Sequence, residues 1–302
     1  MTHYLDPKND LIFKRIFGEH KHLCISLLNN MLPLEPAHQI VELEYLPPEL
    51  TPELPVLKNS LVDVRCIDKR GRQFLVEMQM HWTETFKSRV LFNASKAYIK
   101  QLEPREQYKF LQPVYALSFV NEIFDHSSAE YYHHYKIVNI ADTQKRIEGL
   151  EFVFIELPKF TPDSRAEKKL YNLWLTFLTQ PNEHNEAPAA LLEEELTREA
   201  LQCLERWSYS AEDLEIYDLC WDAVRTQQMY VIDALDKGEA IGLQKGKEEG
   251  RAEGEAIGLQ KGRAEAMREM VLSAHRNGHS VAQIQSFTTL SAAEIENILQ
   301  QY

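Results

Sequence analysis

Two short segments carry side chains that could act together in chemistry. One contains Asp63, and the other contains Glu77 and Gln79 in the run Phe74-Leu75-Val76-Glu77-Met78-Gln79. Both segments have the composition of β-strands. Because residues two apart on a strand share a face, Glu77 and Gln79 are expected to point the same way. Whether Asp63 joins them depends on how the two strands pair.

The register of this hairpin has two alternatives. A loop with an even number of residues pairs Asp63 with Val76 and separates the two carboxylates. A three-residue loop, Lys69-Arg70-Gly71, pairs residue 68 with residue 72 and therefore Asp63 with Glu77. Three-residue hairpin loops favour glycine at their third, left-handed position, and Gly71 stands there. The sequence thus favours the register that places the carboxylates side by side.

Two opposed carboxylates repel each other unless a cation lies between them. Asp63 and Glu77 would offer hard oxygen ligands suited to Mg²⁺ or Mn²⁺, and the Met78 carbonyl could add another. Such a cation polarises a scissile phosphate and lowers the pKa of bound water, while Gln79 would orient that water or contact the phosphate. The alternative is an ordinary solvated pair of surface carboxylates, which the residue types alone favour.

A helix is expected over residues 83–103, after the Gln79 strand. Its predicted core-facing stripe consists of Leu91, Ala94, Tyr98 and Leu102, and its opposite face carries Arg89, Asn93, Lys96 and Lys100. Spacings of four, three and four place these last four residues on one face, where Arg89, Lys96 and Lys100 could hold DNA phosphates. A solvated basic face is the alternative interpretation.

Four further polar residues near the predicted site or elsewhere need an interpretation. Asp10 could be a third acid beside the metal or could cap a helix N-terminus, and Lys14 could supply positive charge to the site. His133 and His134 lack the spacing of metal ligands and are expected on the surface.

Positioning the carboxylates requires an α/β domain, which we place at residues 1–182. Helices are expected within 9–32, 83–103 and 164–180, and strands over 38–46, 60–67, 73–80, 113–120 and 151–157. After residue 183 the strand patterns end, so an acidic helical region (183–237), a repeat-bearing connector (238–263) and a small helical tail (264–302) are expected to follow.

The net charge of −13 is unevenly distributed among these segments. Residues 183–218 carry 11 acidic and 2 basic groups, whereas residues 65–110 carry 10 basic and 5 acidic groups. The segment that bears the candidate site is therefore basic enough to approach nucleic acid. The sequence has no run of about 18 apolar residues that would cross a membrane and four scattered cysteines, so a cytoplasmic protein is expected.

The helical last third indicates self-association. Residues 214–235 alternate spacings of three and four, which suits either packing on the chain's own domain or a seam with a partner. GEAIGLQKG occurs at 238–246 and again at 254–262, with glycine at every fourth position. These glycines permit a close helix contact, although a mobile helical connector is the favoured interpretation. In the tail, Ser280 with Gln283 and Ser291 with Glu294 predict two capped helices.

The order of these segments resembles the core of the PD-(D/E)XK nuclease superfamily, and more closely its recombination-promoting nuclease and transposase-like family. The matching stretches are Asp10 to Gly18, Asp63, Val76-Glu77-Met78-Gln79, and Arg89 through Lys96-Ala97-Tyr98. The resemblance covers about residues 6–160. It implies a restriction-endonuclease-like core, a mixed sheet flanked by helices, and metal-dependent DNA endonuclease activity. Gln79 stands where the superfamily usually has lysine.

The sequence therefore predicts a Mg²⁺- or Mn²⁺-dependent DNA endonuclease that self-associates through its helical C-terminal region. Asp63 and Glu77 would bind the metal and Gln79 would act with them in catalysis. The alternative is a catalytically degenerate nuclease-fold protein that binds DNA or assembles without cutting. Gln79, which cannot supply positive charge, motivates that alternative.

Overall fold

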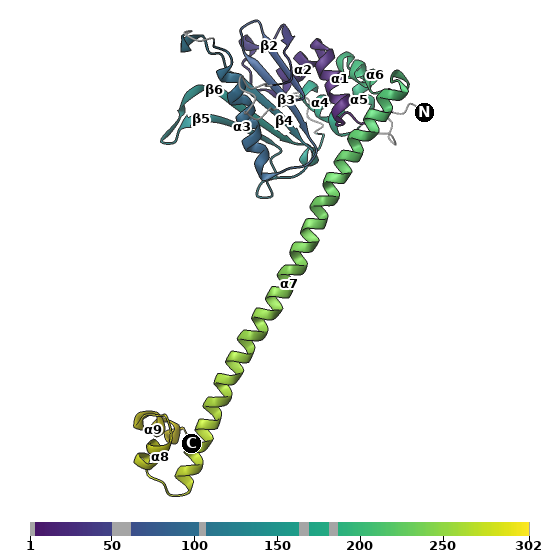
Figure 1. Ribbon diagram of the computed structural model, residues 1–302. Coiled ribbons are helices and arrows are strands. Elements are labelled where there is room, and N and C mark those ends of the chain that lie inside the picture. The colour runs from purple at the N-terminus through teal and green to yellow at the C-terminus, as the bar shows by residue number, and fades with distance from the viewer. Residues whose placement is uncertain (1–3, 50–61, 103–106, 163–168, 181–186, 302) are drawn as a thin grey trace. The chain divides into compact units, whose positions relative to one another are not determined.

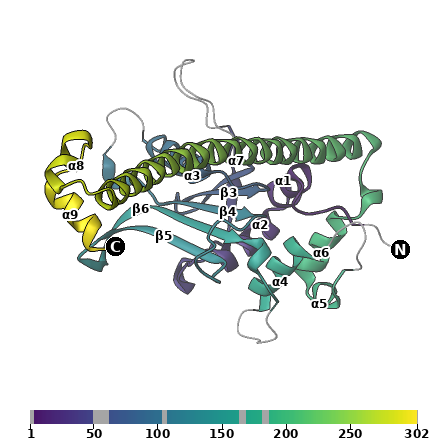
Figure 2. The same cartoon turned by 90° about the horizontal axis from the view of Figure 1, so that it is seen from below.

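The computed structural model describes residues 4–49, 62–102, 107–162, 169–180 and 187–301, and a mixed sheet lies at its centre (Figure 1). The sheet order is β1-β2-β3-β4-β6-β5, with β3, β4 and β6 parallel and antiparallel pairs at both edges. Figure 2 shows β3, β4 and β6 side by side. The strands span Leu43–Tyr45 (β1), Val64–Asp68 (β2), Gln73–Gln79 (β3), Val114–Val120 (β4), Tyr132–Asn139 (β5) and Asp142–Glu156 (β6).

The hairpin between β2 and β3 has the register that the glycine position predicts. Val64 pairs with Val76 and Cys66 with Phe74, so continuing the ladder by one residue brings Asp63 opposite Glu77. Gly71 closes the three-residue loop in the left-handed region, with φ of 81°, and its N–H donates to the Asp68 carbonyl. The predicted register is confirmed, although β2 begins at Val64, so that Asp63 directly precedes the strand.

Replacing Gly71 by valine is expected to destabilise this hairpin. A non-glycine residue in the left-handed region costs roughly 1–2 kcal/mol, and a β-branched side chain is the least suited to it. The new Cβ would also stand 3.0 Å from Gln112 Cγ. Urea denaturation should show the lower free energy of unfolding. Gly238→Val is the comparison, because Gly238 is not in a left-handed turn and nothing among the described residues outside its own helix lies within 4 Å of its Cβ position.

Helices cover both faces of the sheet. Leu75, Val114 and Ala116 pack under α3 (Glu84–Ile99) on one face. Phe74, Val76 and other side chains of the opposite face pack in the main core with four helices. These are α1 (Asp10–Glu19), α2 (Lys21–Met31), α4 (Lys169–Thr179) and α6 (Glu195–Cys203). The core therefore continues beyond residue 182, where the α/β domain was expected to end.

The face that α3 turns to the sheet differs from the predicted one. Phe86, Val90, Ala94 and Ala97 are buried, whereas Leu91, placed in the predicted stripe, is 50% exposed. Phe86 and Val90 determine this rotation, because both reach the apolar cluster that contains Leu75 and Phe154. As a consequence Asn93 and Lys96 are buried at the edge of the packed face rather than opposite it.

Several predicted element boundaries were also wrong. The predicted strand 38–46 reduces to β1, and the predicted strand 60–67 to β2, with residues 60 and 61 outside the described part. The sequence did not predict β5 and the first half of β6. Both are largely exposed, and exposed strands lack a continuous apolar run. The predicted helix 188–206 is divided into α5 (Ala189–Glu193) and α6. Residues 163–168, which include the start of the predicted helix 164–180, lie outside the described residues.

A single helix, α7 (Ala211–Arg276), runs through three of the predicted C-terminal segments. Two compact units meet within it, Met1–Gln228 and Met229–Tyr302. The first unit takes in α5, α6 and the beginning of α7, because Leu191, Leu201 and Tyr217 join the main core. The predicted boundaries at 182, 237 and 263 thus differ from this division. Within the described residues, no helix combines the length and apolar composition of a membrane span.

The C-terminal tail has the predicted caps. Ser280 and Gln283 form a reciprocal capping box at α8 (Val281–Phe287), and Ser291 and Glu294 form another at α9 (Ala292–Gln300). Both helices pack on the end of α7 through a small apolar cluster of Val271, Ala274, Ile284 and Ile295. The tail is therefore folded against its own helix.

Candidate functional site

Glu77 and Gln79 lie at the carboxyl end of β3, on the face that α3 covers. The parallel ladder places Ser118 beside Glu77, and places Val120 and then Glu156 beyond Gln79. Glu77 is 6% exposed and Gln79 is partly exposed, so the polar side chains lead from the interior to the rim of the sheet. Ligand sites of open α/β sheets commonly occur at the carboxyl ends of parallel strands.

Asp63 lies next to this strand end and is held from two sides. Its Oδ2 accepts a hydrogen bond from the Met78 backbone N–H at 2.6 Å, which ties it to β3. Its Oδ1 is 3.5 Å from the Lys14 Nζ of α1. Lys14 also pairs with Asp10 one turn earlier at 2.7 Å. The N-cap of α1 is Asn9, whose side chain accepts from the Leu11 N–H, so Asp10 is the pairing partner of Lys14 and not the cap.

The charge balance around Asp63 is negative. Burial raises the pKa of Asp63 to about 7, and the charges of Asp10 and Glu77 add to the rise, against the opposing effects of the Met78 N–H and of Lys14. Burial lowers the pKa of Lys14, but its bonds to Asp10 and Asp63 raise it overall. Lys14 thus pairs with two carboxylates. A further positive charge beside them would stabilise their ionised forms.

Glu77 is held by two residues of α3. Arg89 Nη2 approaches Glu77 Oε2 at 3.3 Å, and Asn93 Nδ2 donates to Glu77 Oε1 at 3.2 Å. Burial raises the pKa of Glu77, and these two contacts oppose part of the rise. The position of the helix on the sheet therefore sets the orientation of the glutamate.

The Gln79 amide connects Arg89 to the end of the strand. Arg89 Nη2 donates to Gln79 Oε1 at 2.6 Å, and Gln79 Nε2 donates to the His81 carbonyl at 2.5 Å. The amide therefore has a partner at each end. It holds the Arg89 guanidinium beside Glu77.

The other predicted DNA-binding residues of α3 differ in exposure. Lys100 is exposed at the C-terminal end of the helix, and Arg89 is 50% exposed in its side chain. Lys96 is only 9% exposed, with its Nζ 5.1 Å from the centroid of the Phe92 ring. Burial and the neighbouring Lys100 lower the pKa of Lys96. The three residues therefore lie along one side of α3 but differ in how far their side chains are exposed to solvent.

Two buried polar atoms in this region have no hydrogen-bond partner among the described residues, Asn93 Oδ1 and Ser118 Oγ. Both belong to residues that neighbour Glu77, by a hydrogen bond and by strand register respectively. Buried polar atoms normally have a partner, so each indicates a water molecule or an ion. Sequence reasoning missed Ser118, because a single serine inside an apolar strand gives no distinct signal.

The donor set is compatible with a hard divalent cation. Asp63 and Glu77 offer oxygen ligands, the surrounding charge is negative, and Mg²⁺ commonly keeps several waters beside one or two carboxylates. In the described residues, no group of three or more His, Cys, Asp and Glu side chains has a metal-holding arrangement. A cation here would therefore rely on the two carboxylates together with backbone oxygen and water.

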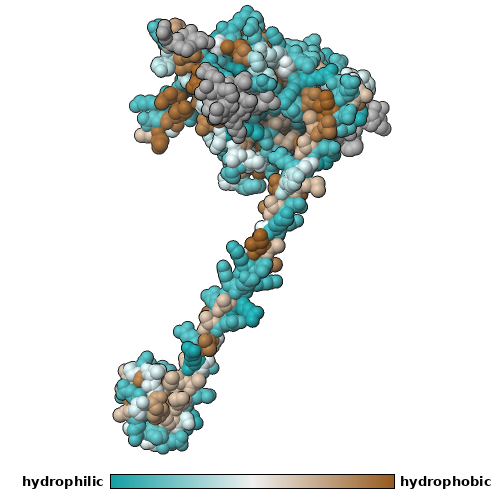
Figure 3. Space-filling view, in the orientation of Figure 1, coloured by the Kyte–Doolittle hydropathy of each residue, from teal (hydrophilic) through white to brown (hydrophobic). Residues whose placement is uncertain are grey.

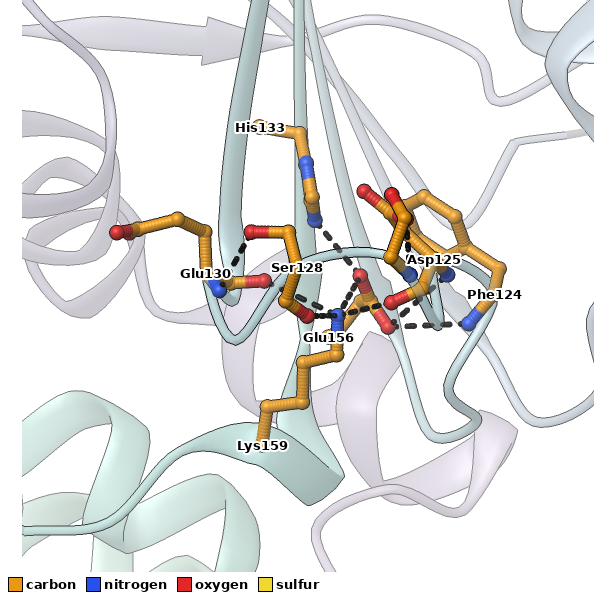
Figure 4. A network of polar contacts seen from close by, with 8 residues as sticks. Phe124, Asp125, Ser128, Glu130, His133, Glu156 and Lys159 are labelled. Atoms are coloured by element: carbon orange, nitrogen blue, oxygen red, sulfur yellow. Dashed lines mark hydrogen bonds and ion pairs between the residues drawn. The ribbon is translucent and has the colours of Figure 1, made fainter.

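A second polar network lies at the same end of the sheet and anchors the loop after β4 (Figure 4). The fully buried Glu156 accepts from Lys159 Nζ at 2.9 Å and from the Phe124 N–H at 3.0 Å. Lys159 also donates to backbone carbonyls of that loop at Asp125, Ser128 and Glu130. His133, expected on the surface, is instead 12% exposed and lies 2.7 Å from Glu156, because β5 packs it beside the end of β6.

The anchored loop reaches the residues that follow Gln79. Glu122 Oε2 accepts from the Trp82 N–H at 2.6 Å, and Trp82 stacks on Phe124 with ring centroids 4.0 Å apart. The Asn121 N–H donates to the Gln79 carbonyl at 2.8 Å. The network around Glu156 therefore helps to hold the backbone at the end of β3.

The chain was compared with known protein families, curated proteins and solved structures. A family model described as PD-(D/E)XK nuclease family transposase matches residues 7–234 of the 302, which include every residue of the candidate site. Among curated proteins and among solved structures, no significant match is found.

Proposed function

The chain belongs to the PD-(D/E)XK nuclease family transposases, and from that membership we propose that it is a divalent-metal-dependent DNA endonuclease. The observation that carries the proposal is that Asp63 and Glu77 lie near the carboxyl end of β3, in a hairpin register that places them opposite each other. Transposase-like proteins act on DNA, and we infer the same substrate here.

In this proposal Asp63 and Glu77 hold Mg²⁺ or Mn²⁺. The cation, when bound, polarises the scissile phosphate and offsets the charge that develops on it. The Met78 N–H and Asn93 orient the two carboxylates. Lys14 and Arg89 contribute positive charge on either side of the acids, a role usually given to the lysine that Gln79 replaces.

The cations of α3, namely Arg89, Lys96 and Lys100, are proposed to hold the DNA backbone as well. Lys100 is the exposed member at the end of α3, and Arg89 is half-exposed near the acids. Lys96 lies between them along the helix and would reach a phosphate only at the surface beside Phe92. Phosphate contacts of this kind position the duplex without reading its sequence.

Nicking of supercoiled plasmid tests the proposal. Wild-type protein with Mg²⁺ or Mn²⁺ is expected to convert supercoiled plasmid to open circles, and Glu77→Gln is expected to lower the rate by about a hundredfold or more, because it removes a charged metal ligand. Glu151→Gln is the matched control: Glu151 is a largely buried glutamate with its own partners, His134 and Lys136. Equal rates for wild type and Glu77→Gln would overturn the enzyme assignment.

A second candidate function is DNA binding without cleavage. The observation that favours it is the Gln79 amide, whose two ends already have partners in Arg89 and His81. Titration calorimetry with Mn²⁺ separates the two functions. Absence of metal binding together with retained DNA binding would favour the second candidate, whereas metal binding that disappears in Glu77→Gln supports the first.

We also infer that the helical C-terminal region mediates self-association, as its sequence pattern predicts. The exposed apolar side chains of α7 support this inference, among them Ile232, Leu235, Leu243 and Ile257.

A further inference from the structure

The part of α7 in the second unit exposes apolar side chains along its length. Ile232 is 49% exposed, Leu243 is 61% exposed and Ile257 is 45% exposed. Figure 3 shows such apolar residues recurring along the helix between hydrophilic ones. Toward its end, Val271 and Ala274 are already covered by α8 and α9. The stretch up to residue 268 therefore has apolar side chains that the described residues leave uncovered.

These side chains belong to one helix face that is symmetric about Gly250. Each residue advances about 100° around an α-helix, so steps of four and three alternate along one face. Counting back from Gly250, the residues of this face follow at steps of four, three, four, three and four. Counting forward from Gly250 gives the same series. The face consists of Ile232, Asp236, Glu239, Leu243, Gly246, Gly250, Gly254, Ile257, Lys261, Ala264 and Arg268.

Within residues 239–261 the side chains on the two halves of this face are complementary. An antiparallel copy centred on Gly250 places each residue opposite the one at the same separation on the other side of Gly250. Leu243 then meets Ile257, and Glu239 meets Lys261. The outermost pairs, Asp236 with Ala264 and Ile232 with Arg268, add neither a charge pair nor an apolar pair. Every such contact occurs twice, as a two-fold axis requires.

A parallel, in-register pair lacks this complementarity. It would place Glu239 against Glu239 and Lys261 against Lys261, and like charges in contact are unfavourable. The glycines add a geometric argument. Gly246 would lie opposite Gly254, and apart from nearby atoms of the helix itself no described atom stands within 4 Å of the Cβ position at either. Two backbones could therefore approach closely at the centre of an antiparallel pair, where glycine otherwise only weakens the helix.

We propose that residues 232–268 of α7 form an antiparallel two-helix interface with a second copy of this chain, with the two-fold axis at Gly250. The occupant is a second copy because one face carries both halves of the complementary set. This interface gives an orientation and a register to the self-association inferred above, and it does not depend on nuclease activity.

Disulfide crosslinking of the full chain tests the orientation. Gly250→Cys is expected to form a crosslinked dimer under mild oxidation, because the axis brings the two copies of residue 250 together. Leu243→Cys alone is expected to give no more dimer than the parent chain, since its two copies would be 14 residues, about 21 Å, apart along the helices. A mixture of Leu243→Cys and Ile257→Cys is expected to crosslink. The parent chain, with its own four cysteines, gives the background.

Sedimentation equilibrium tests the charge pairing independently of added cysteines. Lys261→Glu places a glutamate opposite Glu239 in both symmetry-related contacts and is expected to weaken association by roughly 5- to 30-fold. Adding Glu239→Lys exchanges the charges and should restore the wild-type affinity. Efficient self-crosslinking of Leu243→Cys would overturn the antiparallel orientation, and a monomeric wild-type chain would overturn the interface itself. Plasmid nicking is measured separately, so failure here leaves the nuclease proposal standing.

Discussion

Replacing Asp63 by asparagine is expected to abolish metal-dependent cleavage and also to stabilise the metal-free protein at pH 8. The Asp63 carboxyl has an ordinary pKa of 3.8 that burial and neighbouring acids raise to about 7 in the folded chain. An acid whose pKa is higher in the folded state destabilises that state once it ionises. Asparagine removes this charge, and its side-chain oxygen can still accept from the Met78 N–H.

The stabilisation should depend on pH in a defined direction. Below about pH 4 Asp63 is protonated in the folded and the unfolded chain, so the variant should gain little there. Between about pH 4 and 7 the wild type loses stability relative to the variant, because the unfolded chain ionises first. Above the folded pKa of about 7 the difference should level off at about 4 kcal/mol.

Urea denaturation in EDTA at pH 5 and pH 8 measures this difference. Asp222→Asn is a suitable control, because the Asp222 side chain is 66% exposed and pairs with Arg225 across an exposed helical turn. Its effect should stay within about 0.5 kcal/mol. Mn²⁺ should then stabilise the wild type but not Asp63→Asn, since only a ligand that binds the folded site raises stability. A variant that is less stable than wild type at pH 8 would mean that Asp63 holds the hairpin and is not strained by its charge.

Local turn chemistry made the register of the carboxylates predictable from sequence. Gly71 is required by the left-handed turn, and once that turn is placed every pair along β2 and β3 follows from counting residues. The caps at Ser280 and Ser291 were predictable for the same reason, because a capping box is defined within four residues. The charge pattern of α7 about Gly250 can likewise be counted from the sequence, because all of its residues lie on one helix.

Features that depend on packing between distant segments were not predictable. The rotation of α3 follows from Phe86 and Val90 reaching Phe154, and this contact decides that Asn93 and not Leu91 is buried. The network around Glu156 required β5, an exposed strand without an apolar run, to bring His133 to the end of β6. Ser118 became part of the site only through the parallel pairing of β3 with β4.

Lysine at position 79 is expected to restore cleavage to a chain that lacks Arg89. Arg89→Ala should lower the nicking rate by roughly 10²- to 10³-fold, the usual effect of removing one preorganised group that stabilises developing charge. Gln79 Oε1 accepts from Arg89, which also contacts Glu77. A lysine at 79 would bring a positive charge to the same end of β3, so Arg89→Ala/Gln79→Lys should regain at least about tenfold of the lost rate.

The coupling between the two positions can be measured with a double-mutant cycle. If Gln79 acts by holding Arg89, then Gln79→Ala should lower the rate strongly in the wild type and only slightly in Arg89→Ala. Arg146→Ala is the matched control, because Arg146 is a half-exposed arginine that pairs with Glu148 on β6. Additive losses, with no rescue by lysine, would assign Arg89 to the DNA backbone and would leave Lys14 as the cation beside the acids. Rescue would instead mean that two residues take the part of the superfamily's usual lysine in this chain, Arg89 by carrying the charge and Gln79 by positioning it.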